Sequence, residues 1–276
     1  ERHANFYKNF NKTNLVKIYE IIKNKVKYLK KKFFNVEFVS HESEIYKDKN
    51  IDLVSIASYD NFHYKQIINC LKYKKDIFIE KPICLSLKEL KEIKRFYKNS
   101  KSKISCNLIL RGYSKFKKIY QINKQNKFGK IFYIEGDYNY GRIKKITTGW
   151  RGKIPFYSVT YGGGVHMIDL ITWILNELPF QVKAESNKIT TKNSSFKYDD
   201  FSVALLKFKS GKIAKISSNF GCMIPHHHSL NIFGSKSTLI HNFKKTSIYK
   251  SRNKKVKPEE IKMNFKNKDK NNLFKD

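Results

Sequence analysis

Short apolar runs alternate with amphipathic stretches over residues 1–113, and this order constrains the fold more than any other feature of the sequence. The run Asp52–Ala57 is nearly continuous in apolar residues, which is typical of a parallel strand covered on both faces. We expect strands over residues 15–19, 36–39, 52–57, 76–80 and 104–110, and helices over residues 23–32, 62–74 and 87–98. Strands and helices in this order predict βαβ units, and therefore an α/β domain with a doubly wound, Rossmann-type parallel sheet.

The pattern changes after about residue 127, where strand-like segments follow one another through short turns such as Ser210-Gly211. These strands are expected over residues 130–140, 201–209, 212–220 and 230–233, with one helix over residues 164–175. Such an arrangement predicts an α+β domain with a largely antiparallel sheet. We therefore expect a dinucleotide-binding domain over residues 1–113 and a substrate-binding domain over residues 114–276, the part after about residue 250 being a lysine-rich loop.

The formal net charge of +34 leaves two interpretations open. Lysines that neutralise phosphates could bind a nucleic acid or another anionic partner. However, the lysines are spread over the whole length and accompany abundant Asn, Ile, Phe and Tyr, as an AT-rich coding sequence would produce. We favour this background, and we expect no specific nucleic-acid partner.

The remaining composition indicates a cytoplasmic protein. The sequence is 40% hydrophobic, with 21 Phe and 17 Tyr, so it can bury a substantial core. It has no run of about 18 apolar residues that could span a membrane, and it opens on polar and basic residues instead of a signal peptide. The four cysteines lack CxxC spacing, which favours reduced thiols.

Glu20 ends the first expected strand, where an acidic residue of a dinucleotide-binding fold takes the ribose hydroxyls. That acid lies about 20 residues beyond the last glycine of a G-x-G-x-x-G turn. No such turn occurs in the sequence, and counting back from Glu20 places its last glycine just before Glu1. Glu20 is therefore either an ordinary surface acid or a ribose ligand, and the second role would favour NAD because a carboxylate repels the 2′-phosphate of NADP.

Several motifs follow in a fixed order. Ala57-Ser58 ends a strand, His63 comes shortly after it, and Glu80-Lys81-Pro82 follows the next strand. Farther on, the sequence reads GGGVHMID over residues 162–169 and FKSGK over residues 208–212. In this order the motifs resemble the Gfo/Idh/MocA (glucose–fructose oxidoreductase, inositol dehydrogenase, rhizopine catabolism) family. The resemblance covers nearly the whole chain and implies an NAD(P)-dependent oxidoreductase.

The same resemblance implies a longer gene product. Family members begin with G-x-G-x-x-G-x-x-H, and Glu1-Arg2-His3 resembles the end of this motif. They end with a helix, and Asn272-Leu273-Phe274 resembles the start of that helix. We therefore expect a fragment that lacks the first strand, the glycine-rich turn and the C-terminal end. Because the family's first strand lies in mid-sheet, neighbouring strand edges would be left unpaired.

The resemblance assigns most of the cofactor site to the ends of these strands. Lys81 is the first candidate for catalysis, because its ammonium could hydrogen-bond both the cofactor and the reacting oxygen. Pro82 fixes the turn, and the resemblance implies a cis peptide bond before it. The expected cofactor-binding residues are Glu20, Ala57, Ser58, His63, Glu80, Lys81 and Pro82.

His166 and Asp169 stand three residues apart, so they share a face of the expected helix. The helix N-terminus disfavours an imidazolium there, and the resemblance implies that His166 is the acid/base or substrate ligand with Asp169 beside it. Many family members carry an Asp four residues before this His, where Gly162 stands here. Without this Asp, the proton relay is simpler, another residue supplies the missing group, or the enzyme has changed its chemistry. The absence of the Asp favours sugar or nucleotide-sugar oxidation over inositol-type dehydrogenation.

Aromatic and cationic side chains near the expected sheet suit sugar stacking and phosphate pairing. Three consecutive histidines, His226 to His228, rarely chelate one ion because neighbours on a strand point different ways, so we expect no metal site. We expect His227 to face the substrate instead. The expected substrate-binding residues are Lys81, Tyr138, Trp150, Arg151, His166 and His227, with Tyr140 and Arg142 as further candidates.

We therefore predict an NAD(P)-dependent oxidoreductase acting on a secondary alcohol of a sugar, with a nucleotide sugar favoured. His166 would remove the proton, hydride would pass to the nicotinamide, and Lys81 would polarise the reacting oxygen. A homo-oligomer through the second-domain sheet is expected. The alternatives are a family member that binds cofactor or sugar without turnover and, from the charge alone, a nucleic-acid-binding protein.

Overall fold

The computed structural model describes residues 1–261, which form two compact units. Unit 1 spans Glu1–Asn107, and unit 2 begins at Leu108. This division falls before the boundary expected at residue 113, because the segment that follows Asn107 belongs to unit 2. The expected helix start at Asn272–Phe274 lies outside the described residues. None of the helices within residues 1–261 has the length and apolar character needed to cross a membrane.

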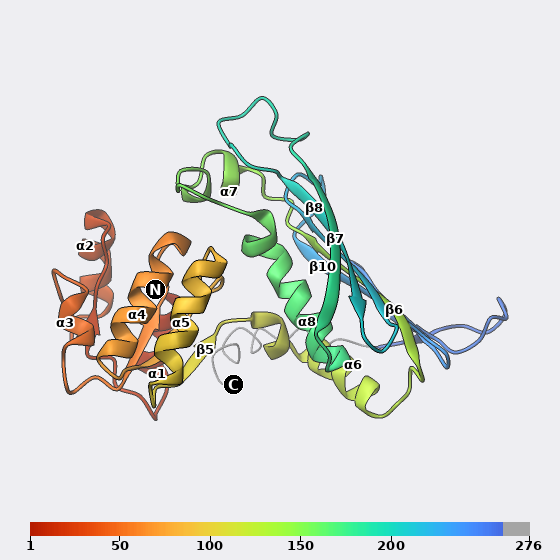
Figure 1. Cartoon of the computed structure of the whole chain (residues 1–276), viewed down its shortest axis with the longest axis horizontal. Helices are drawn as coiled ribbons and strands as arrows, with labels where there is room; N and C mark the ends of the chain where they lie inside the picture. Colours follow the sequence, from red (N-terminus) through yellow and green to blue (C-terminus); the bar gives the residue numbers. More distant parts are fainter. Residues whose placement is uncertain (262–276) are drawn as a thin grey trace. The chain divides into compact units, whose positions relative to one another are not determined.

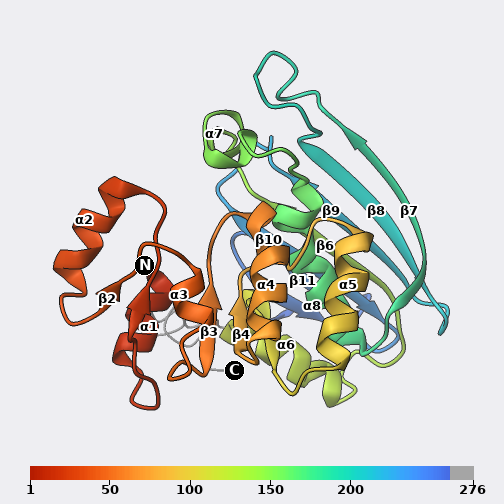
Figure 2. The same ribbon diagram turned by 60° about the vertical axis from the view of Figure 1, so that its left-hand side comes forward.

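Unit 1 contains parallel strands connected by helices (Figure 2). Its strands are β1 (Lys17–Ile18), β2 (Glu37–Phe38), β3 (Leu53–Ile56), β4 (Asp76–Ile79) and β5 (Ile104–Cys106). Its helices are α1 (Arg2–Asn9), α2 (Lys23–Lys32), α3 (Ser43–Tyr46), the short 3₁₀ turn η1 (Asp60–Phe62), α4 (His63–Lys72) and α5 (Leu87–Lys98). The Rossmann-type fold class is therefore confirmed.

Local sequence determines several of these elements. Helix α5 begins at Leu87 because the Ser86 hydroxyl accepts a hydrogen bond from the Glu89 backbone N–H at 3.2 Å, while Glu89 accepts one from the Leu85 N–H. This is a capping box, in which two otherwise unpaired donors of the first turn are satisfied reciprocally. Helices α4 and α5 pack side by side, and α4 buries Ile67 and Ile68 in the core beside β3 and β4.

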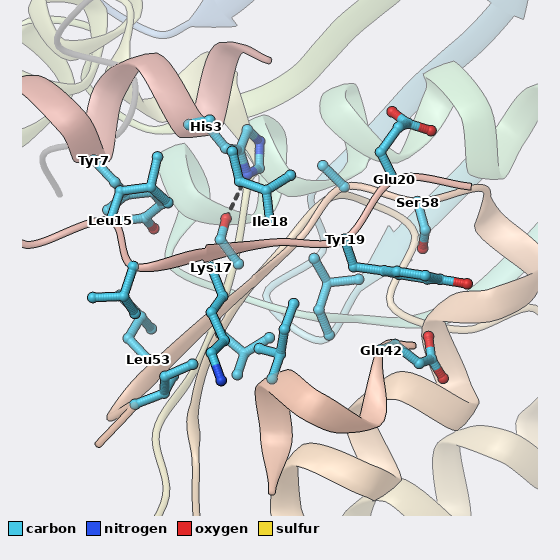
Figure 3. Close-up of a pocket in the computed structure, with 18 of the residues that line it drawn as sticks. His3, Tyr7, Leu15, Lys17, Ile18, Tyr19, Glu20, Glu42, Leu53 and Ser58 are labelled. Carbon is cyan, nitrogen blue, oxygen red and sulfur yellow. Dashed lines mark hydrogen bonds between the residues drawn. The ribbon is translucent and has the colours of Figure 1, made fainter. Parts of the chain in front are cut away.

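The parallel sheet of unit 1 is interrupted. Strand β1 pairs with β2, and β3 pairs with β4 and then β5, but no pairing among the described residues joins β1 to β3. A cavity of about 1000 Å³ lies between these two strands and is lined by residues 15–22 and 51–59 along their lengths. Its lining also includes His3 and Tyr7 of α1 (Figure 3).

Unit 2 is an eight-stranded sheet with helix α8 (Val165–Leu175) along one face (Figure 1). The strands are β6 (Ile131–Asn139), β7 (Pro179–Asn187), β8 (Phe201–Phe208), β9 (Ile213–Asn219), β10 (His227–Gly234), β11 (Thr238–His241), β12 (Thr246–Tyr249) and β13 (Glu259–Glu260). Their order is β13-β12-β11-β10-β6-β9-β8-β7, and all pairs are antiparallel except β6–β9. Gly136 allows the close approach of α8, because a Cβ there would stand 2.8 Å from the Met167 side chain.

Other short elements connect this sheet, and two of them correct the expectations. The elements are η2 (Ile109–Gly112), α6 (Ser114–Lys124), α7 (Lys144–Thr147), η3 (Trp150–Gly152) and η4 (Thr160–Gly164), the last a turn of π-helix. The strand expected to reach Leu110 ends at Cys106, because the chain turns into η2. Helix α6 was not expected, although Phe116, Ile119 and Ile122 recur every three residues and are buried.

Candidate active site

The cavity of unit 1 has a polar end at the carboxyl ends of β1 and β3. Figure 3 shows Glu20 and Ser58 at this end and Leu15 and Leu53 at the other. Glu20 Oε1 accepts a hydrogen bond from the Ile22 backbone N–H at 3.0 Å. Its second oxygen accepts none within residues 1–261, so it is available to hydroxyl donors such as those of a ribose. Glu20 thus lies at the end of β1, the place where an acidic residue of a dinucleotide-binding fold binds the ribose hydroxyls.

A buried histidine connects helix α1 to the strands beneath it. His3 Nδ1 lies 2.7 Å from Ser55 Oγ, and His3 Nε2 lies 3.0 Å from Glu80 Oε1. The Asn107 amide donates to the same Glu80 oxygen at 2.8 Å. Burial would raise the pKa of Glu80, but these hydrogen bonds hold it below its usual value. Glu80 thus joins α1, β4 and the end of β5, a connection that the sequence motif alone did not indicate.

His63 is buried between two chain segments, and its expected contact with the cofactor stays a prediction. Its side chain is fully buried, with Nδ1 2.6 Å from the Pro82 carbonyl and Nε2 3.3 Å from the Ser58 carbonyl. The ring therefore holds together the chain segments that follow β3 and β4. The cis peptide bond between Lys81 and Pro82, implied by the family resemblance, is confirmed.

Ser58 also belongs to a short chain of polar side chains. Its hydroxyl donates to Gln66 Oε1 at 2.6 Å, and the Gln66 amide donates to Glu42 Oε2 at 2.8 Å. Glu42 lines the same cavity (Figure 3). Ala57 and Ser58 therefore lie on the cavity wall, whereas Pro82 is held by His63 in the neighbouring turn that also contains Lys81; the cofactor contacts expected of these residues stay predictions.

In unit 2, His166 belongs to a cluster of aromatic and imidazole rings. His166 is 4% exposed, and its ring centroid lies 5.9 Å from that of Tyr138 on β6. The rings of His226 and His228 each lie 5.1 Å from Tyr138 and 4.9 Å from each other. Burial lowers the pKa of both His226 and His228, so these rings are neutral near pH 7 and can accept or donate hydrogen bonds.

His227 lies on the opposite face of the sheet from this cluster, and its expected substrate-binding role stays a prediction. The register pairs His228 with Tyr138 and His227 with Asn139, and side chains alternate between the two faces of a strand. His227 instead contacts Phe243, with ring centroids 5.4 Å apart. The histidines on the His166 face are therefore His226 and His228. No group of three or more residues among the described ones could hold a metal ion.

Asp169 is engaged by Arg111. Arg111 Nε donates to Asp169 Oδ2 at 2.8 Å, and Arg111 Nη2 donates to Oδ1. The Asp169 side chain is 9% exposed and the Arg111 side chain 45% exposed, so only the carboxylate side of this bidentate pair is shielded from water. The pair attaches α8 to the segment that precedes α6, and the catalytic role expected for Asp169 stays a prediction.

Gly162 leaves room for a tyrosine. A Cβ at Gly162 would stand 1.9 Å from the Tyr157 hydroxyl oxygen, and Tyr157 is 1% exposed. Any side chain at position 162 would therefore collide with Tyr157. The Tyr157 phenol occupies the space that the side chain of an Asp at position 162, one helical turn before His166, would need. This explains why glycine stands where many family members have Asp.

A parallel-sheet unit followed by a unit with a largely antiparallel sheet is the architecture expected from the sequence for a nicotinamide-dependent oxidoreductase of two domains. Residues 1–108 match the model of the oxidoreductase family with an NAD-binding Rossmann fold, and residues 116–240 match the GFO/IDH/MocA C-terminal domain. The chain therefore belongs to the Gfo/Idh/MocA family of oxidoreductases.

Relatives with names and structures agree with this family. The chain is 23% identical over 254 residues to a myo-inositol 2-dehydrogenase of Thermotoga maritima, covering 89% of this chain and 73% of that protein. It is 23% identical over 192 residues to a 2,7-anhydro-N-acetylneuraminate hydratase of Escherichia coli, covering 69% and 51%. A crystal structure of scyllo-inositol dehydrogenase from Lactobacillus casei with NAD(H) and scyllo-inositol bound has a TM-score of 0.77 at 20% identity, covering 88% of this chain and 73% of that one.

Proposed function

We propose that this protein uses NAD to oxidise a secondary alcohol of a sugar or sugar-like polyol. The observation that carries the proposal is the match to both family domains in order, with Glu20 at the polar end of the unit 1 cavity. The names of the Thermotoga and Lactobacillus relatives support a polyol substrate. NAD, when bound, takes up the hydride from the alcohol carbon.

The chain's own residues would then handle the proton and the oxygen. His166 is the proposed base, because an imidazole ordinarily titrates at about pH 6.5 and can accept the hydroxyl proton near neutrality. Tyr138 packs against its ring and limits the orientations that it can adopt. Lys81 is proposed to polarise the reacting oxygen, in a turn that His63 and Pro82 hold in place.

Two finer proposals complete this function. A nucleotide sugar is the favoured substrate, since Arg151, Trp150 and Tyr138 suit phosphate pairing and sugar stacking. A homo-oligomer would form through the face of the unit 2 sheet opposite α8. A protein that binds cofactor or sugar without turnover is the alternative, and the Escherichia coli relative named as a hydratase is a reason to test the reaction itself.

The test combines turnover with cofactor choice. The protein is incubated with NAD or NADP and a panel of inositols, hexoses and nucleotide sugars, and reduced cofactor is followed by its absorbance. We expect NAD to be preferred, and Glu20→Ala to reduce this preference by at least about tenfold, because the variant loses both the ribose ligand and the repulsion of the 2′-phosphate. Tighter binding of NADP by the unmutated protein would show that the role of Glu20 is wrong, and cofactor binding without reduction would support the alternative.

A further inference from the structure

Arginine is scarce in this chain, and its positions are therefore informative. Only six of the 57 basic residues are arginines, in a composition where lysine supplies nearly every positive charge. Two of the six, Arg142 and Arg151, occur in the short segment that connects β6 to α8. A guanidinium has a planar fork of donors that matches a carboxylate or phosphate, which a lysine ammonium does not. Two arginines this close together suggest that the fork geometry is needed there.

The contacts of these two arginines leave their charges unneutralised. The Arg142 guanidinium carbon lies 5.5 Å from the Tyr140 ring centroid, and the Arg151 guanidinium carbon lies 4.5 Å from the Trp150 ring centroid. Neither forms an ion pair with a carboxylate in the part of the chain that the structure describes. Stacking on an aromatic ring restrains a guanidinium while its N–H edge stays free to donate.

The surroundings of the two arginines are cationic as well. The positive charges of both arginines act on the buried Tyr138 hydroxyl. The charged groups that act most on His226 and His228 are other bases, namely Arg142, Lys115, His166 and His227.

We propose that Arg142 and Arg151 together bind an oxyanion carried by the substrate, a carboxylate or a phosphate attached to the sugar. The aromatic faces of Tyr140 and Trp150 hold the guanidinium groups in orientation, and each guanidinium donates charge-assisted hydrogen bonds to the anion. This inference rests on the proposed function, and it restricts the substrate class from sugars in general to anionic sugars. Neutral inositols and hexoses would bind the same site without these hydrogen bonds.

Equilibrium binding tests this inference without turnover. Isothermal titration calorimetry at physiological salt compares glucose with glucuronate, glucose 6-phosphate and UDP-glucose, which separate a carboxylate, a monophosphate and a diphosphate as the source of the charge. We expect at least one anionic sugar to bind at least about tenfold more tightly than glucose, as two charge-assisted hydrogen bonds would provide. The double variant Arg142→Gln/Arg151→Gln should remove this advantage of the anionic sugar over glucose.

Two further variants separate a site from the general positive field of the protein. Arg252→Gln removes one exposed arginine charge elsewhere in unit 2 and should change nothing. Arg151→Lys keeps the charge but loses the fork, and should retain only part of the advantage. Equal affinities for glucose and for every anionic sugar, an equal loss in Arg252→Gln, or no binding of any anionic sugar would overturn the proposal. If anion binding depends on both arginines but no substrate reduces the cofactor, the anion site is supported and the proposed reaction is contradicted.

Discussion

Tyr157 and Gly162 show how one residue's volume determines its neighbour. The tyrosine is buried against Phe196 and Phe220, and its hydroxyl occupies the space where a side chain at position 162 would begin. Gly164, two residues later in the same turn, is also buried, but a Cβ there would meet its nearest neighbour, the Ser218 Cβ, at 3.3 Å. These two glycines therefore form a matched pair that differs in the space beside them.

Gly162→Ala should lower the free energy of unfolding by roughly 1–3 kcal/mol, the usual cost of overpacking a filled site. Gly164→Ala should be close to neutral, because alanine favours a helix and Ser218 needs to move by only a few tenths of an ångström. Urea unfolding followed by tryptophan fluorescence measures both variants in unit 2, which holds the two tryptophans of the chain, Trp150 and Trp173. Equal effects of the two substitutions would contradict the assigned role of Tyr157.

Still at the residue scale, the order of the motifs along the chain indicated more of the cavity-lining residues than the chemistry of the individual side chains did. Glu20, Ala57 and Ser58 line the cavity, and the cis peptide before Pro82 is present. The sequence could not show that His63 is fully buried between two carbonyls, or that Arg111 engages Asp169, because both facts depend on segments brought together by folding. The sequence also could not show which face His227 occupies, because the register of its strand with β6 decides this.

At the scale of elements, hydrophobic periodicity predicted helices and strands that are buried on one side and missed elements that are mostly exposed. Helices over residues 23–32 and 87–98 were predicted with their observed bounds, the second from its amphipathic pattern and the first as a lysine-rich helix with a solvated face. Strand β7 was missed because it lies at the edge of its sheet and nearly all its residues are exposed, so no alternation marks it. Helix α1 was missed because its one buried residue is a histidine, and its attachment to Glu80 is a tertiary contact.

The strands β10 and β11 bring two histidines into the core, and this makes unit 2 sensitive to acid. Burial lowers the pKa of His241 to about 3, with the nearby Lys115 charge adding to the effect, and lowers that of His228 well below 6.5. The unfolded chain therefore binds protons below pH 6.5 that the folded unit does not. Protonation of these two rings therefore does not reduce the free energy of unfolding above pH 6.5, and reduces it progressively as the pH falls toward 3.

We expect the free energy of unfolding of unit 2 to fall between pH 6.5 and 5 by up to about 1.4 kcal/mol per pH unit for each of the two histidines. His241→Gln should reduce this slope by about the contribution of one proton. Urea titrations at a series of pH values, again with tryptophan fluorescence, provide the measurement. A slope that His241→Gln leaves unchanged would show that this ring protonates freely in the folded unit.

At the scale of the whole molecule, the outer face of the unit 2 sheet is the surface proposed for self-association. Tyr133 on β6 pairs with Ile213 on β9 and with Phe233 on β10, all opposite the face that α8 covers. Leu205 and Ile213 are 50% and 43% exposed. Exposed apolar side chains at the centre of a broad sheet are typical of a protein–protein interface.

The double variant Leu205→Arg/Ile213→Arg should convert an oligomer to monomers, because two unpaired charges would be buried at the interface. Leu178→Arg, at a 78% exposed position before β7, is the control and should leave the assembly unchanged. Sedimentation velocity measures the mass of each. A wild-type protein that is monomeric at micromolar concentration, or a double variant that stays assembled, would show that this face is not the interface.

The central claim is that this chain oxidises a sugar alcohol with His166 as the base, and a pH–rate profile tests it most directly. With NAD and the best substrate, kcat/KM should rise with pH through one ionisation at or below that of an ordinary imidazole, about 6.5. His166→Ala should lower the rate by roughly 10²–10⁴-fold and remove this limb, whereas Lys81→Ala should lower the rate and keep it. A His166→Ala variant with near-normal activity and the same limb would contradict the account.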